Sequence, residues 1–112
     1  SAPFHCSLMK NAATKMKEKI NPISFKKLNN EIISNVTASS EKDPEKIKKL
    51  LVDQIYTKVR WRESILYMSK NGISEFIEIG PGKVLSGLVK RIIKESKVNS
   101  INSIDDIKNT FK

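Results

Sequence analysis

Cysteine, histidine and aromatic residues are scarce in this sequence, and their scarcity argues against several kinds of site. Cys6 is the only cysteine, so an internal disulfide is excluded and a cytoplasmic location is expected. A single cysteine and a single histidine, His5, do not supply the ligands of a zinc site, and we expect no metal or other cofactor. No apolar run approaches the length of a membrane span, so no membrane partner is expected.

Acidic residues are outnumbered, and the formal net charge is +9 at pH 7. The lysines are spread along the chain, and the sequence has no arginine-rich run, aromatic RNA-binding motif or zinc spacing, so nucleic acid is not the expected partner. Solvated helix faces are the preferred explanation of the charge. If the charge serves a partner, an acidic carrier protein or the phosphates of coenzyme A would suit it as well as DNA.

The most informative pattern lies between residues 73 and 93. A short apolar strand over residues 76–79 leads into the breaker Gly80-Pro81-Gly82, and apolar residues then recur at the spacing of one helix face over residues 84–93. Residues 98–101 follow as a returning strand, so the stretch is typical of a parallel strand–helix–strand unit.

The remaining chain alternates in the same way. We expect an extended segment over residues 1–7, a helix over 7–20 capped by Ser7, a strand over 31–37 and a polar loop over 39–42. Further helices are predicted from Asp43 to about residue 55, over 61–71, and over 104–111 behind Ser103. The fold class is therefore α/β, with about three strands in a largely parallel sheet. Such a sheet is incomplete on its own, and the missing initiator methionine also suggests a piece of something longer.

Four segments, in order SAPFHCSLMK, IISNVTA, LLVDQIYTKVRW and EIGPGKVLSGLVKRI, resemble the C-terminal part of malonyl-CoA–acyl carrier protein transacylases. The resemblance covers nearly the whole chain. It implies that residues 1–112 are the C-terminal segment of an acyltransferase domain, with the histidine segment at 1–20 and core elements at 31–112. It further implies a hydrolase-like core with a small ferredoxin-like subdomain elsewhere, and three partners: malonyl-CoA, acyl carrier protein and the missing N-terminal part.

The resemblance also assigns three site residues. His5 stands where the family has the general base that activates a serine nucleophile. Gln54 matches the residue whose main-chain carbonyl orients that histidine, although the residues alone favour a surface glutamine near a helix end. Phe4 lies directly before His5. In related acyltransferases, a bulky aromatic residue at this position goes with a preference for malonyl over branched acyl groups. Without the resemblance, a lone histidine is more often structural.

Two further features have alternative interpretations. Cys6 beside His5 suggests a cysteine–histidine pair, but neighbours in an extended segment point to opposite sides, so a packed cysteine is favoured. Gly80-Pro81-Gly82 before a helix has the form of an anion cradle, but we favour a structural turn whose glycines allow close packing of strand and helix.

Several parts of a working transacylase are missing from the sequence. It has no GHSxG nucleophile motif, no oxyanion segment and no arginine assigned to the malonyl carboxylate, because Arg60 and Arg62 belong to a different motif. Asn11 replaces a common proline, a minor departure. We therefore expect part of a malonyl transferase of fatty-acid synthesis that is inactive alone. The alternatives are an acyltransferase domain of a polyketide synthase and a non-catalytic basic binding module.

Overall fold

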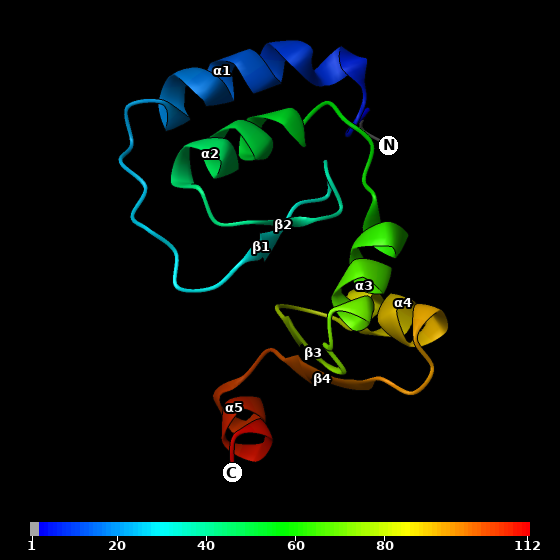
Figure 1. Ribbon diagram of the computed structural model, residues 1–112. Helices are drawn as coiled ribbons and strands as arrows, with labels where there is room; N and C mark the ends of the chain where they lie inside the picture. Colours follow the sequence, from blue (N-terminus) through cyan, green and yellow to red (C-terminus); the bar gives the residue numbers. More distant parts are fainter. Residues whose placement is uncertain (1–2) are drawn as a thin grey trace. The chain divides into compact units, whose positions relative to one another are not determined.

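The computed structural model describes residues 3–112, and the chain divides into two compact units, Ser1–Ser64 and Ile65–Lys112 (Figure 1). The first unit is mainly helical with two very short strands. The second combines two parallel strands with helices. One helix, α3 (Trp61–Lys70), contains residues of both units. Within the described residues, no helix has both the length and the apolar composition needed to cross a bilayer.

Two helices form the body of the first unit. α1 (Lys10–Ile20) and α2 (Pro44–Asp53) lie side by side (Figure 1). The buried apolar residues of this unit include Ala13 on α1 and Ile47 and Val52 on α2. Burial of these apolar side chains where the two helices meet stabilises the pair.

The start of α2 follows the predicted capping pattern. The carboxylate of Asp43 accepts a hydrogen bond from the backbone N–H of Glu45 at 2.9 Å, and Pro44 takes the first helical position, where its missing N–H costs nothing. This cap fixes where α2 begins, and the helix ends ten residues later at Asp53. The position of that end is important for the candidate site.

The N-terminal segment differs from the prediction. A 3₁₀ helix, η1 (Ser7–Met9), precedes α1, and Ser7 is its first residue instead of the cap of one continuous helix. Residues 1–2 of the expected extended segment lie outside the described residues, and Phe4 and His5 form a turn. His5 has a φ of 57°, in the left-handed region that residues other than glycine seldom adopt.

The strand predicted over residues 31–37 is wrong for most of its length. Only β1 (Ile32–Ile33) forms, and it pairs antiparallel with β2 (Ser40–Glu41), which lies in the predicted loop. The hydroxyl of Ser34 accepts a hydrogen bond from the N–H of Val36, and the Ser34 carbonyl accepts one from Ala38. These local bonds compete with strand pairing and fold residues 34–38 into a turn.

The helix α3 agrees with the helix predicted over residues 61–71. It ends at a glycine, because Gly72 has a φ of 91°, and the N–H of Ile73 bonds back to the carbonyl of Met68 at 3.0 Å. This left-handed glycine closure is a common way to satisfy the last carbonyls of a helix.

The second unit contains the predicted strand–helix–strand motif. β3 (Glu75–Ile79) pairs parallel with β4 (Lys97–Ile101), in a register that places Phe76 opposite Val98, and α4 (Val84–Ile92) connects the two strands and packs on both. The last helix, α5 (Ile104–Thr110), is capped by Ser103 as predicted, through a 3.1 Å bond from the N–H of Asp106. The α/β fold class and the parallel pairing are confirmed.

The turn before α4 is built differently from our expectation. Gly80 and Gly82 have φ values of 136° and 84°, but a Cβ at either position would meet no atom within 4 Å. The glycines are thus needed for backbone conformation and not for close packing of strand and helix. The carboxylate of Glu78, at the end of β3, accepts hydrogen bonds from the N–H of Ser86 at 2.8 Å and of Leu85 at 3.3 Å.

Apolar side chains on two surfaces of the second unit remain exposed. On the face of β3 opposite Glu78, Ile79 is 81% exposed and Ile77 is also exposed. On α5, Ile104 and Phe111 beside its end are exposed as well. A two-stranded parallel sheet with one uncovered apolar face agrees with the expectation of a fold that is incomplete on its own.

We expect Glu78→Gln to lower the thermal unfolding temperature at neutral pH, because it removes a charge that binds the N-terminus of α4. Hydrogen bonds from Ser86 and Leu85 hold the pKa of Glu78 below its ordinary value. The carboxylate therefore stabilises the fold above the unfolded pKa of about 4.3, and this contribution is lost as the pH falls through the lowered folded pKa.

Thermal unfolding followed by circular dichroism between pH 7 and pH 3 measures this effect. Glu95→Gln is the matched control, because it removes the same charge from a side chain that has no hydrogen bond or ion pair within residues 3–112. Equal unfolding temperatures for the two variants at pH 7 would contradict the proposed role of Glu78.

Candidate functional site

The only histidine lies against the C-terminal end of α2. Nδ1 of His5 is 2.8 Å from the carbonyl oxygen of Gln54, and the backbone N–H of His5 donates to the carbonyl of Ile55 at 3.2 Å. Both contacts lie within the first unit. The left-handed turn at His5 allows its backbone and its ring to reach two successive carbonyls, and strained backbone of this kind is concentrated at functional sites.

The end of α2 explains why these carbonyls are available. The last carbonyls of an α-helix have no partner within the helix. Here the carbonyl of Asp53 accepts the hydroxyl of Thr57 at 2.9 Å, whereas those of Gln54 and Ile55 accept the two donors of His5. The histidine therefore completes the hydrogen bonding of the helix end, and the helix end in turn fixes the histidine.

The hydrogen bond defines the protonation pattern of the neutral ring. A carbonyl oxygen only accepts, so Nδ1 of His5 carries the hydrogen and Nε2 has a free lone pair. An oriented imidazole with a free Nε2 is suited to accept a proton from a hydroxyl or thiol. The ring is exposed within this chain, so such a group has access to it.

The sequence-predicted residues are therefore partly brought together. The expected contact between His5 and the main-chain carbonyl of Gln54 is present. The catalytic roles of the two residues stay predictions, because the contact alone does not test them. Phe4 is 65% exposed, and its role in substrate selection also stays a prediction.

Cys6 makes a separate contact. Its thiol donates to the carbonyl of Pro3 at 3.0 Å. The expectation that Cys6 and His5 point to opposite sides assumed an extended backbone at both residues, but His5 is left-handed, so that argument does not apply. Among residues 3–112, no group of three histidine, cysteine or acidic side chains could hold a metal ion.

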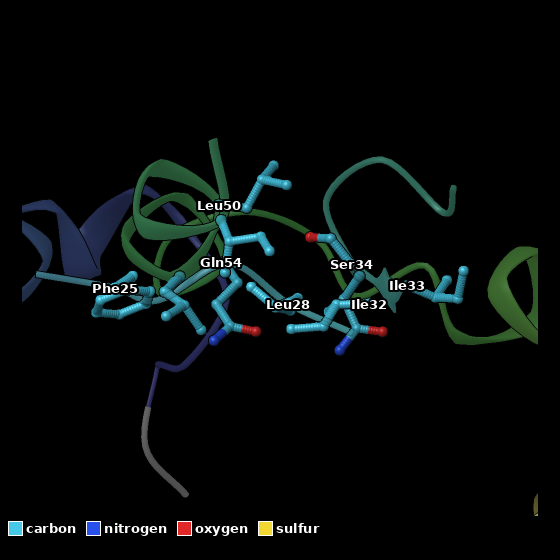
Figure 2. Close-up of a pocket in the computed structure, with 10 residues that line it drawn as sticks. Phe25, Leu28, Ile32, Ile33, Ser34, Leu50 and Gln54 are labelled. Carbon is cyan, nitrogen blue, oxygen red and sulfur yellow. The ribbon is translucent and has the colours of Figure 1, made fainter. Parts of the chain in front are cut away.

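An apolar hollow of about 360 Å³ adjoins the same helix end. Figure 2 shows its lining, which includes Leu50 of α2, Gln54 directly after that helix, and Phe25, Leu28 and Ile32 from the segment before it. Gln54 thus lines the hollow while its carbonyl binds His5. The sequence reading missed Phe25 and Leu28, although apolar residues three apart in a polar stretch are a detectable signal.

An internal carboxylate competes with an anion at Gly80-Pro81-Gly82, the alternative interpretation of this turn. The carboxylate of Glu78 already occupies the N–H groups at the start of α4, and it also accepts from the hydroxyl of Ser86 at 2.6 Å. An incoming phosphate would have to displace this internal anion.

Known proteins resemble the chain throughout its length. No protein-family model matches it. The malonyl CoA-acyl carrier protein transacylase of Bacillus subtilis is 43% identical over 107 residues, which are 96% of this chain and 34% of the relative. An acyl-carrier-protein-S-malonyltransferase structure from Bartonella henselae has 42% identity and a TM-score of 0.93, covering 98% of this chain and 35% of that one.

A third similar protein is a malonyl-transacylase solved in complex with the acyl carrier protein of a type II polyketide synthase. It is 36% identical with a TM-score of 0.89, covering 97% of this chain and 35% of that one. The chain therefore spans about a third of the length of the relatives that it matches.

We expect Gln54→Ala to leave the tautomer of His5 unchanged, because the hydrogen bond goes to the backbone carbonyl and not to the side-chain amide. The nitrogen chemical shifts of the neutral ring measure the tautomer by NMR, and the urea-denatured chain serves as the reference. Loss of the Nδ1–H form on truncation of Gln54 would contradict this assignment.

Proposed function

We propose that this chain, which is similar to malonyl CoA-acyl carrier protein transacylases over about a third of their length, is part of such an enzyme and carries its general base. The enzyme would move a malonyl group from coenzyme A to the phosphopantetheine thiol of an acyl carrier protein. The observation that carries the proposal is the 2.8 Å contact between Nδ1 of His5 and the Gln54 carbonyl, which leaves Nε2 free to accept a proton.

The proposed mechanism has two half-reactions. In the first, a serine hydroxyl attacks the malonyl thioester while Nε2 of His5 takes the hydroxyl proton; the carbon–sulfur bond then breaks, and His5 protonates the departing thiolate of coenzyme A. In the second, His5 takes the proton of the carrier thiol, which attacks the malonyl-serine ester, and then returns the proton to the serine. The Gln54 carbonyl keeps the ring oriented and stabilises the imidazolium that forms.

The serine must come from polypeptide outside these 112 residues, because the chain has no GHSxG motif. The same applies to the oxyanion donors and to the arginine for the malonyl carboxylate. Arg60 is already engaged, since its guanidinium pairs with Glu63 at 2.7 Å and donates to the carbonyl of Thr37 at 3.2 Å. We propose that the missing N-terminal part of the enzyme packs on this chain and that the chain alone is inactive.

The remaining elements of the proposal follow from this chemistry. Backbone donors stabilise the negative charge of the tetrahedral intermediates, so the mechanism includes no metal or cofactor. The expected cytoplasmic location stays a prediction that rests on the single cysteine.

A carrier protein of polyketide synthesis is the second candidate acceptor, favoured by the similar transacylase that was solved with such a carrier.

In the complete transacylase, His5→Ala should reduce malonyl transfer by about 10²–10⁴-fold, because the serine loses its base. Steady-state transfer of radiolabelled malonyl to the carrier measures this loss, with circular dichroism to confirm the fold. Cys6→Ser is the matched control at the neighbouring position and should retain transfer. Turnover that survives His5→Ala would remove His5 from the proposed role, and an equal loss in Cys6→Ser would attribute the effect to general disruption of this segment.

Phe4→Ala should widen the range of acyl groups. If Phe4 narrows the acyl site, its removal raises kcat/KM for methylmalonyl-CoA relative to malonyl-CoA. We expect a change of about tenfold, because a pocket discriminates by about this factor between substrates that differ by one methyl group. Competition between the two thioesters measures the ratio. An unchanged ratio would exclude Phe4 from substrate selection without affecting the assignment of His5.

A further inference from the structure

The chain leaves α2 through a turn at residues 54–57, and the backbone of this turn is weakly held. Its last backbone bond back to the helix runs from the N–H of Tyr56 to the carbonyl of Asp53 and is 3.3 Å long. The next three backbone N–H groups, at residues 57–59, have no acceptor within the described part of the chain. Other groups must therefore keep the turn in place.

A threonine side chain supplies such a restraint. The hydroxyl of Thr57 donates to the carbonyl of Asp53 at 2.9 Å, which is shorter than the backbone bond to the same oxygen. Thr57 is half-buried, so water competes less for this bond than it would at an exposed position. The hydroxyl thus ties the far end of the turn to the last residue of α2.

The residue that receives this bond is itself fixed. The carboxylate of Asp53 pairs with the ammonium group of Lys49 one turn earlier in α2, and it also accepts the hydroxyl of Tyr56 at 3.1 Å. Asp53 is therefore held through its side chain as well as by its place in the helix. It gives the Thr57 hydroxyl a firm point of attachment.

The two carbonyls that hold His5 lie between the tied residues. Nδ1 of His5 is 2.8 Å from the oxygen of Gln54, and the N–H of His5 donates to the oxygen of Ile55 at 3.2 Å. Each peptide group is planar, so the dihedral angles on either side of it set the direction of its carbonyl. A bond that closes the turn around Gln54 and Ile55 limits these angles and thereby the orientation of the imidazole.

The same kind of bond elsewhere in the first unit has different surroundings. The hydroxyl of Thr14 donates to the carbonyl of Lys10, also four residues earlier, at 3.1 Å. Thr14 lies inside α1, where the hydrogen bonds of the helix already hold the backbone. The Thr57 bond lies where neighbouring N–H groups have no acceptor within residues 3–112, so its loss should move the backbone more.

We propose that Thr57 is a positioning residue for the transfer reaction, because its hydroxyl holds the turn whose carbonyls orient the imidazole of His5. The inference rests on the proposed malonyl transfer. The hydroxyl of Thr57 bonds to Asp53 and not to His5, so it acts on the ring only through the Gln54 and Ile55 carbonyls. Proton transfer depends on the distance and direction of the base, so a loosened turn slows the reaction and leaves substrate binding intact.

The test compares variants of the complete transacylase. Thr57→Val removes the hydroxyl and keeps the branching of the side chain, Thr57→Ala removes both, and Thr57→Ser keeps the hydroxyl. Thr14→Val is the matched control, because it removes the same type of bond from α1. One readout is the fraction of the Nδ1–H tautomer of His5, from ring nitrogen chemical shifts assigned with His5→Ala. The others are kcat and KM for malonyl-CoA, with circular dichroism to confirm the fold.

We expect Thr57→Val and Thr57→Ala to lower the Nδ1–H fraction toward that of the urea-denatured protein. They should also lower kcat by about 10–10²-fold with an unchanged KM, because a displaced catalytic group loses rate and not binding. Thr57→Ser and Thr14→Val should retain both the tautomer and kcat.

Three results would overturn the proposal: a kcat that does not fall, a fall in kcat with an unchanged tautomer, or an equal effect of Thr14→Val. Failure of Thr57→Ser to retain the tautomer would overturn it as well. An unaltered enzyme that transfers no malonyl would instead refute the proposed function, and the tautomer in Thr57→Val would still decide whether the hydroxyl orients the ring.

Discussion

The hydrogen bond between His5 and the end of α2 is the interaction on which the functional argument depends. It joins residues 49 positions apart, so it exists only if α2 begins and ends at the right residues. Asp43 and Pro44 set the beginning, and the helix ends where the carbonyls of Gln54 and Ile55 become available. An imidazole that binds a main-chain carbonyl has its orientation fixed by the fold and not by another titratable group, so no change in carboxylate ionisation releases it.

α2 contributes to three features at once. Gln54, directly after the helix, holds the histidine through its carbonyl. Leu50 and Gln54 line the apolar hollow, and Asp53 lines a polar hollow between α1 and α2. A change in the length or rotation of this helix would alter all three features together. Both ends of the short helix are held, by the Asp43 cap at its start and by donors to the carbonyls of Val52, Asp53, Gln54 and Ile55 at its end.

The sequence was sufficient for features that depend on local chemistry. Asp43, Ser103 and Gly72 each determine a helix end through their own side chain or lack of one, and all three were read correctly. The predictions that failed concern segments where hydrogen bonds override the backbone conformation that the pattern of apolar residues predicts. Ser34 draws its own segment into a turn, and the left-handed backbone of His5 depends on carbonyls far along the chain. The contact between His5 and Gln54 was accessible only through family resemblance, because no spacing rule joins two residues so far apart.

The parallel pair of β3 and β4 has an edge on each side that no strand of the second unit covers, beside an apolar face that includes Ile79. Backbone donors and acceptors at such edges are templates for further strands. Where no further strand or helix covers them, these edges and the apolar face would be prone to pair with other chains.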